Sequence, residues 1–168
     1  LSSVFYRGRP SLAIAVAYLV GVLATGGSAR AAVLASAGAN GSSGNGASSE
    51  GAITPNGRFV AFATTARNLV ANDGNGGATD VLLRDVRDGI TTLVSVNRFA
   101  TGTANGASRD PAVTDNGRWV VFTSAADDLV GNDGNGAEDV FVRDLQTSTT
   151  TLVSVKQDGT GSGTGASG

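Results

Sequence analysis

One stretch of this sequence occurs twice, and the internal repeat constrains the fold more than any other feature. Residues 51–96 align with residues 111–155, at an offset of 60 positions before the loop NDGNG and 59 positions after it. Residues 158–168 in turn resemble residues 99–109, as if a third copy began there. A period of this length is typical of proteins built by stacking copies of one supersecondary unit.

Each copy contains four short segments with the composition of β-strands. The expected strands cover residues 49–54, 58–64, 80–85 and 91–96 in the first copy, and 108–114, 118–124, 139–144 and 150–155 in the second. An Asn-Gly step after the first strand of each copy favours a tight hairpin. Apolar residues on both faces of the second strand predict burial on both sides, whereas the fourth strand, with its Thr and Ser, is expected to be half-exposed. Four antiparallel strands per copy describe a β-propeller blade.

The two copies also resemble a known family. The pattern T-[PD]-N-G-R-[FW]-V-[AV]-F, followed after a long loop by D-V-[LF]-[LV]-R-D, resembles the TolB-type, WD-repeat-like β-propeller repeat over residues 49–157. The resemblance implies an all-β fold of four-stranded antiparallel blades, and binding through protein–protein contacts at the propeller faces. A β-solenoid and an eight-stranded sandwich are the alternative folds. Aromatic residues at matched positions, such as Phe59 and Trp119, weigh against low-complexity disorder, and we expect them in the core rather than stacked on a sugar.

The N-terminal segment predicts export. Residues 1–31 contain Arg7 and Arg9, then an apolar run at 12–24, then the small-residue site Ala29–Ala31, which together are typical of a cleaved signal peptide. The apolar run is shorter than the roughly 20 residues of a membrane-spanning helix. We therefore expect an extracytoplasmic protein, secreted or periplasmic, with no stable membrane span after cleavage.

The remaining chain divides into segments that follow the repeat. The expected domains are the signal peptide (1–31), a flexible linker (32–48), propeller blade 1 (49–98), propeller blade 2 (99–157) and the start of a truncated third repeat (158–168). Closed propellers have roughly 4–8 blades. We therefore expect either a fragment of a longer propeller or a protomer that completes the ring by self-association.

Composition excludes several classes of function. The chain has no Cys and no His, so the usual catalytic triads and zinc sites are missing. A net charge of −2 and a pI of about 4.9 do not fit a nucleic-acid partner. We predict a non-enzymatic scaffold that binds a protein or cell-envelope material. The alternative is an accessory propeller domain of a larger secreted hydrolase or lyase.

The repeated loop NDGNG is the strongest candidate for a metal site. Asp, Asn and backbone oxygens bind Ca²⁺, and Gly lets the chain wrap around the cation. In the second copy, Asp133, Asn135 and Asp139 match the later part of D-x-D-x-[DN]-G-x-x-D calcium loops, although Gly131 stands where the first Asp belongs. Ca²⁺ is therefore the one cofactor that the sequence suggests.

The first copy of the loop is the weaker candidate. Asp73, Asn75 and Asp80 supply the same groups, but one extra residue precedes Asp80, and a coordination loop tolerates an insertion poorly. The alternative for both copies is a structural turn, because Asn, Asp and Gly favour turns and an aspartate can cap the loop backbone.

Two Arg-Asp pairs end the third strands. Arg84-Asp85 and Arg143-Asp144 could form a ligand-binding rim, but we favour a charge pair at the end of the strand.

Overall fold

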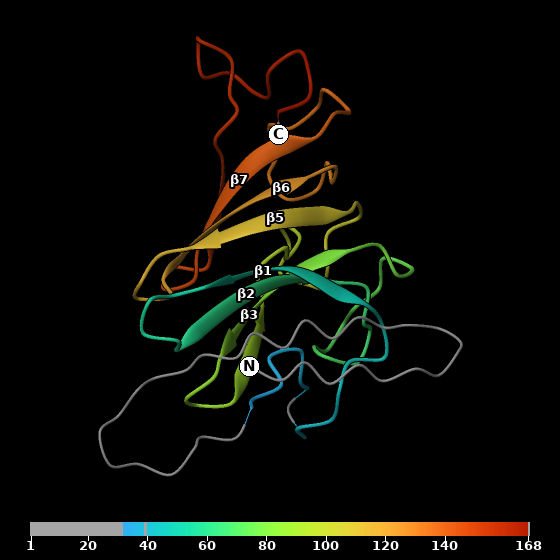
Figure 1. Ribbon diagram of the computed structural model, residues 1–168. Helices are drawn as coiled ribbons and strands as arrows, with labels where there is room; N and C mark the ends of the chain where they lie inside the picture. The colour runs from blue at the N-terminus through green and yellow to red at the C-terminus, as the bar shows by residue number, and fades with distance from the viewer. Residues whose placement is uncertain (1–31, 39, 168) are drawn as a thin grey trace.

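The described residues form eight β-strands in two sheets (Figure 1). The computed structural model describes residues 32–38 and 40–167, so the predicted signal peptide lies outside the described residues. The first sheet consists of β1 (Ser48–Ile53), β2 (Phe59–Thr64), β3 (Asp80–Asp85) and β4 (Ile90–Leu93). The second consists of β5 (Ser108–Val113), β6 (Trp119–Ser124), β7 (Asp139–Asp144) and β8 (Thr149–Leu152).

Both sheets are antiparallel meanders in which the strands pair in chain order. This is the strand order of a propeller blade, and the predicted all-β fold is confirmed. We call the two sheets blade 1 and blade 2. Within the described part of the chain, no helix is long and apolar enough to span a membrane.

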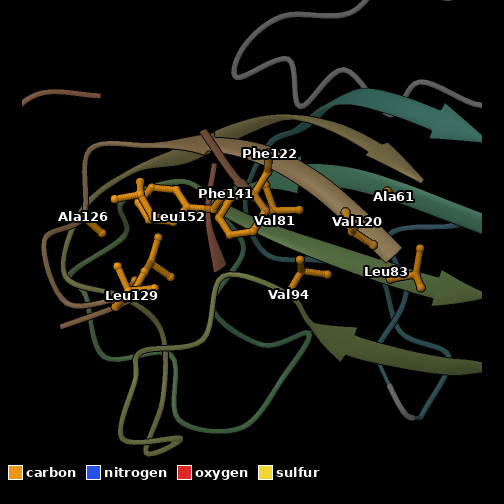
Figure 2. Packing of buried hydrophobic residues seen from close by; sticks show 12 residues of the cluster. Ala61, Val81, Leu83, Val94, Val120, Phe122, Ala126, Leu129, Phe141 and Leu152 are labelled. Atoms are coloured by element: carbon orange, nitrogen blue, oxygen red, sulfur yellow. The ribbon is translucent and has the colours of Figure 1, made fainter. Parts of the chain in front are cut away.

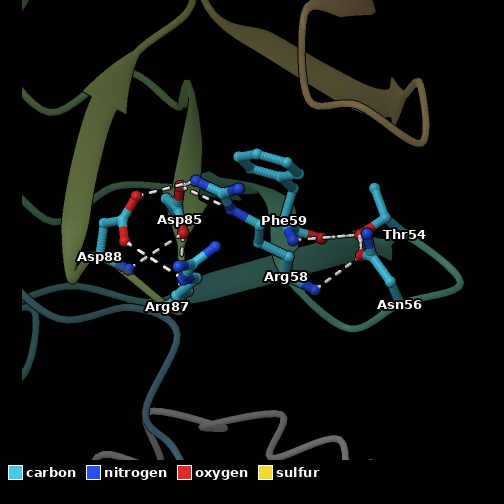
Figure 3. A network of polar contacts seen from close by, with 7 residues as sticks. All are labelled: Thr54, Asn56, Arg58, Phe59, Asp85, Arg87 and Asp88. Atoms are coloured by element: carbon cyan, nitrogen blue, oxygen red, sulfur yellow. Dashed lines mark hydrogen bonds and ion pairs between the residues drawn. The ribbon is translucent and has the colours of Figure 1, made fainter.

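A tight turn joins the first two strands of each blade. In blade 1 the Gly57 amide donates to the Thr54 carbonyl at 2.8 Å, and Gly57 has a φ of 69°, which favours glycine. The Asn56 side-chain oxygen accepts bonds from the Thr54 hydroxyl at 2.7 Å and from the Arg58 amide at 2.9 Å (Figure 3). Blade 2 repeats these bonds with Asp115 in place of Pro55, so the Asn-Gly step is what the two turns share.

The main hydrophobic core lies between the two blades (Figure 2). The rings of Phe122 and Phe141 are fully buried and stack with their centroids 5.8 Å apart. Blade 1 contributes Ala61, Val81, Leu83 and Val94 to this core, and blade 2 contributes Val120, Phe122, Phe141 and Leu152. A smaller cluster around Phe62 and Leu82 packs on the other face of blade 1. The blades therefore stack as repeats that bury apolar faces against each other.

Two apolar residues on one face of β6 are exposed, and the prediction that apolar residues are buried on both faces is wrong for this strand. Val120 and Phe122 point toward blade 1 and are fully buried, whereas Trp119 and Val121 are 37% and 40% exposed. Consecutive strand residues point to opposite faces, and blade 1 covers only one of them. Trp119 is consequently not the core residue that the sequence predicts. The fourth strands, β4 and β8, are half-exposed as predicted.

A short hairpin follows each blade, and the hairpin after blade 1 also packs against blade 2, where the Arg98 amide donates to the Asp128 carbonyl at 2.8 Å. β-Bridges close the hairpins of residues 96–103 and 155–162, and a third bridge joins Ala37 to Ser43. A β-bridge therefore also occurs before blade 1, within residues 32–48, the segment expected as a linker. There, the Ala37 carbonyl accepts a bond from the guanidinium of Arg84 at 3.2 Å, which fastens this segment to blade 1.

An ion pair ties the first turn of each blade to the end of its third strand. Arg58 contacts Asp85 at 2.7 Å (Figure 3). In blade 2, Arg118 contacts Asp144 at 2.7 Å. The predicted pairing of Arg84 with Asp85 is wrong, because neighbours in a strand point to opposite faces. The Arg84 guanidinium instead donates to a threonine hydroxyl of β4 at 2.9 Å. In blade 2, Arg143 likewise donates to a threonine of β8 at 3.0 Å and not to Asp144.

We expect the stabilisation by the Arg118–Asp144 pair to be lost in acid. Hydrogen bonds from Arg118 hold the pKa of Asp144 well below its usual range. In the unfolded chain an aspartate binds its proton near pH ~4. The stabilisation is therefore complete above this pH and is lost as the pH falls toward the lower pKa of the folded state.

Urea unfolding across the acid range should show a shallower fall in stability for Asp144→Asn. The control Asp115→Asn changes an exposed carboxylate in the adjacent turn and should keep the wild-type slope. A wild-type slope for Asp144→Asn would contradict the assignment.

Candidate metal site

The two NDGNG loops form two separate sites, one in each blade. We call residues 72–79, between β2 and β3, loop 1 and residues 132–138, between β6 and β7, loop 2. Each loop runs into a buried aspartate that begins the third strand, Asp80 in blade 1 and Asp139 in blade 2. The structure thus brings Asp73, Asn75 and Asp80 together in one place and Asp133, Asn135 and Asp139 in another.

A serine hydroxyl holds the buried aspartate of each site. Ser95 donates to Oδ1 of Asp80 at 3.0 Å, and Ser154 donates to Oδ1 of Asp139 at 2.6 Å. Both serines lie just after the fourth strand, in the repeated sequence TTLVSV. Sequence reasoning missed them, although their identical place in the two copies was an available signal.

Loop 1 is closed by its own asparagine. The side-chain amide of Asn75 donates to both carboxylate oxygens of Asp80, at 3.2 and 3.0 Å, and to the Ala104 carbonyl at 3.2 Å. Burial raises the pKa of Asp80 to about 7, the charge of Asp73 adds to this rise, and the bonds from Ser95 and Asn75 oppose it. Both oxygens of Asp80 already have donors. The buried oxygens without a partner in this loop are Oδ1 of Asp73 and Oδ1 of Asn75.

Loop 2 has the opposite arrangement. The amide of Asn135 donates to the Gly163 carbonyl at 2.8 Å, and its oxygen accepts a bond from the Ala137 amide at 2.8 Å. Among the described residues, no side-chain amide donates to Asp139. Both carboxylate oxygens of Asp133 and Oδ2 of Asp139 are buried without a hydrogen-bond partner. Loop 2 therefore has three carboxylate oxygens free to accept a donor or bind a cation.

The two carboxylates of loop 2 repel each other. Burial raises the pKa of Asp133, and the charge of Asp139 raises it further. The Ser162 hydroxyl and the Asn135 backbone amide lie close enough to favour the charged form of Asp133, although neither reaches the geometry of a hydrogen bond with it. A buried charge is costly unless it is paired, so this site favours a proton or a cation between the two carboxylates.

The donor set of loop 2 fits a hard cation better than a transition metal. Ca²⁺ binds carboxylate, amide and backbone carbonyl oxygens and does not need nitrogen or sulfur ligands. No group of three or more Asp, Glu, His or Cys that could hold a metal occurs within residues 32–38 and 40–167. A cation at loop 2 would therefore need backbone carbonyls or solvent as further ligands.

The fold defines a class of protein whose repeats are four-stranded propeller blades. The structure is similar to the crystal structure of TolB from Acinetobacter baumannii, with a TM-score of 0.40 and 18% sequence identity. The match covers 68% of this chain and 22% of the TolB chain, so this chain spans about a fifth of that protein's length. No protein-family model matches the sequence, and no curated protein matches it. The assignment of blades rests on the strand order and stacking described above.

Proposed function

We propose that this chain is an exported, non-enzymatic scaffold whose propeller blades bind a protein or cell-envelope partner. The observation that carries the proposal is an apolar face of blade 2 that lies exposed. We call the surface formed by Trp119, Val121 and Val153 the open face. Exposed apolar patches of this kind mark interaction surfaces. Export is supported by the signal-peptide features of residues 1–31, and the lack of catalytic activity by a sequence without His or Cys.

The open face corresponds, residue by residue, to the face that blade 1 buries against blade 2. Ala61 and Val94 are fully buried there, whereas their counterparts Val121 and Val153 are 40% and 52% exposed. The matched positions are Phe59 and Trp119, Ala61 and Val121, and Val94 and Val153. Blade 1 therefore uses this face to contact blade 2, and the equivalent face of blade 2 is exposed.

The blade contact inside the chain indicates which surface fits the open face. The ring of Phe59 lies against Gly117, where a Cβ atom would come within 2.7 Å of it. Trp119 is the equivalent of Phe59, so we expect its ring to pack against a turn with a glycine at the position of Gly117. Blade 1 has this glycine as Gly57. Beside it, Ile53 is exposed on the face of blade 1 that points away from blade 2. A second copy of this chain therefore offers a complementary surface, arranged head to tail.

We expect the full chain to self-associate through the open face. Size-exclusion chromatography with light scattering should show a mass that rises with concentration. Trp119→Ser should shift the equilibrium toward monomer by about 2 kcal/mol, the effect of removing an aromatic anchor from an interface. The control Phe99→Ser alters an exposed phenylalanine outside the open face and should associate like wild type. A monomer at every concentration, or equal weakening by both variants, would contradict this binding mode.

Calcium is the ion that we propose as a stabiliser of the blades. The buried carboxylate oxygens without partners in loop 2 support this part of the proposal.

A further inference from the structure

We propose that loop 2 binds one Ca²⁺ ion through the carboxylates of Asp133 and Asp139, and that the Asn75 amide keeps loop 1 from binding the ion comparably. The inference deepens the calcium part of the proposed function and rests on it. It is independent of the open face, so the two proposals can fail separately.

The direction of one side-chain amide distinguishes the two loops. Asn75 points its NH₂ group at both carboxylate oxygens of Asp80, which places a donor where a cation would need acceptors. Asn135 points its NH₂ group at the Gly163 carbonyl and leaves Oδ2 of Asp139 without a donor. Loops with the same residue types thus present opposite electrostatic environments to a cation.

Loop 1 is one residue longer than loop 2, and this difference accompanies the different directions of the Asn75 and Asn135 amides. Loop 1 contains two consecutive glycines with positive φ, Gly76 at 79° and Gly77 at 93°, whereas loop 2 has only Gly136 at 66° in this part. The additional left-handed residue gives loop 1 a different path between its asparagine and Asp80. On that path the asparagine amide reaches the carboxylate. The extra residue that weakens the calcium motif in the sequence is therefore linked to a physical block in the structure.

A cation would resolve the unfavourable electrostatics of loop 2. Asp139 is fully buried, with Oδ1 held by Ser154 and Oδ2 unpartnered. Asp133 contributes two further unpartnered oxygens, and its charge interacts unfavourably with that of Asp139. A divalent cation between these groups replaces carboxylate repulsion with two attractions, and it supplies a partner to three buried oxygens that lack one.

The proposed site also joins loop 2 to the hairpin that follows blade 2. The Gly134 amide donates to the Ser162 hydroxyl at 3.2 Å, and the Ser162 amide donates to the Asn132 carbonyl at 3.3 Å. Ser154, just before the hairpin, holds Asp139. Calcium bound by Asp133 and Asp139 should therefore order the loop and the hairpin together, and not the loop alone.

Calorimetric titration of Ca²⁺ into the chelator-treated full chain tests the proposal. We expect about one ion per chain, together with a higher melting temperature in Ca²⁺ than in chelator. Asp133→Asn and Asp139→Asn should each abolish the heat of binding. Ser154→Ala removes the group that orients Asp139 and should weaken binding roughly 10–100-fold.

Matched variants of loop 1 provide the controls. Asp73→Asn and Ser95→Ala make the same changes in blade 1 and should leave the affinity and the stoichiometry unchanged. The wild-type melting shift needs no variant and remains informative if Asp139→Asn fails to fold. No heat and no melting shift would overturn the calcium site and favour a proton shared between the carboxylates. Two ions per chain, or loss of binding in Asp73→Asn, would overturn the distinction between the loops. A wild-type chain that stays monomeric at every concentration but binds calcium would overturn the open-face proposal and leave the calcium site standing.

Discussion

Phe122→Ala is expected to lower the free energy of unfolding by about 3–5 kcal/mol. Phe122 is fully buried between the blades, and its ring stacks on that of Phe141. The substitution removes apolar contacts from both blades and leaves a cavity that the two sheets cannot close without moving. A loss of this size is a large share of the roughly 5–15 kcal/mol that stabilise a typical domain.

Urea unfolding, followed by the fluorescence of Trp119 and by circular dichroism, measures this loss. Trp119 is the single tryptophan of the chain and lies on blade 2, while circular dichroism reports on both blades. Phe99→Ala is the matched control, because Phe99 is 65% exposed. Its effect should stay within about 0.5 kcal/mol. An equally small effect of Phe122→Ala would show that the blades do not share a core.

Gly106→Ala is expected to destabilise the protein by about 1–3 kcal/mol through overpacking. Gly106 lies after the hairpin that precedes blade 2, against the backbone of Ala125 and Ala126. A Cβ atom there would come within 2.6 Å of the Ala126 nitrogen and 2.7 Å of the Ala125 carbonyl carbon and oxygen. Backbone atoms cannot rotate out of the way, so the hairpin and blade 2 would have to separate.

The repeat supplies both a second test and a control for this prediction. Gly46 occupies the same place before blade 1, with its Cβ position 2.6 Å from the backbone of Thr65 and Ala66, so Gly46→Ala should have a similar effect. Gly165 is the equivalent residue of the last hairpin, and a Cβ atom there meets nothing within 4 Å. Gly165→Ala should therefore be neutral or slightly stabilising. Equal losses for Gly106→Ala and Gly165→Ala in thermal or urea unfolding would contradict the explanation by hairpin packing.

The strands could be predicted from the sequence because their signals are local. The apolar run and the Asn-Gly turn before it locate β2 within one residue, and the repeated segment at 80–85 locates β3 without error. The fourth strand was predicted over 91–96 but ends at Leu93. It ends early because Ser95 turns toward Asp80, a contact that the strand composition does not reveal.

The features that could not be predicted from the sequence depend on contacts between segments that are far apart in the chain. Phe59 and Trp119 have matching sequence surroundings, and only the presence of a neighbouring blade makes one half-buried and the other exposed. The structure places the six candidate metal residues in two groups, one in each loop, but the chemical difference between the groups could not be predicted from the sequence. It depends on where the amides of Asn75 and Asn135 point, and this depends on the path of the loop and on the hairpin beside it.

Because of the hairpins, the unit that repeats in the sequence differs from the unit that packs together in the structure. The hairpin after blade 1 bonds to loop 1 through the Thr103 amide and to blade 2 through the Arg98 amide, so no cut between two strands isolates a blade with all of its contacts. An insertion of one full period has a different result. The added segment contains one hairpin and the loops that a hairpin contacts, wherever in the repeat the insertion begins. A chain of this kind can therefore be lengthened by whole periods at any point without loss of a contact, whereas a partial period would leave a hairpin without its loop.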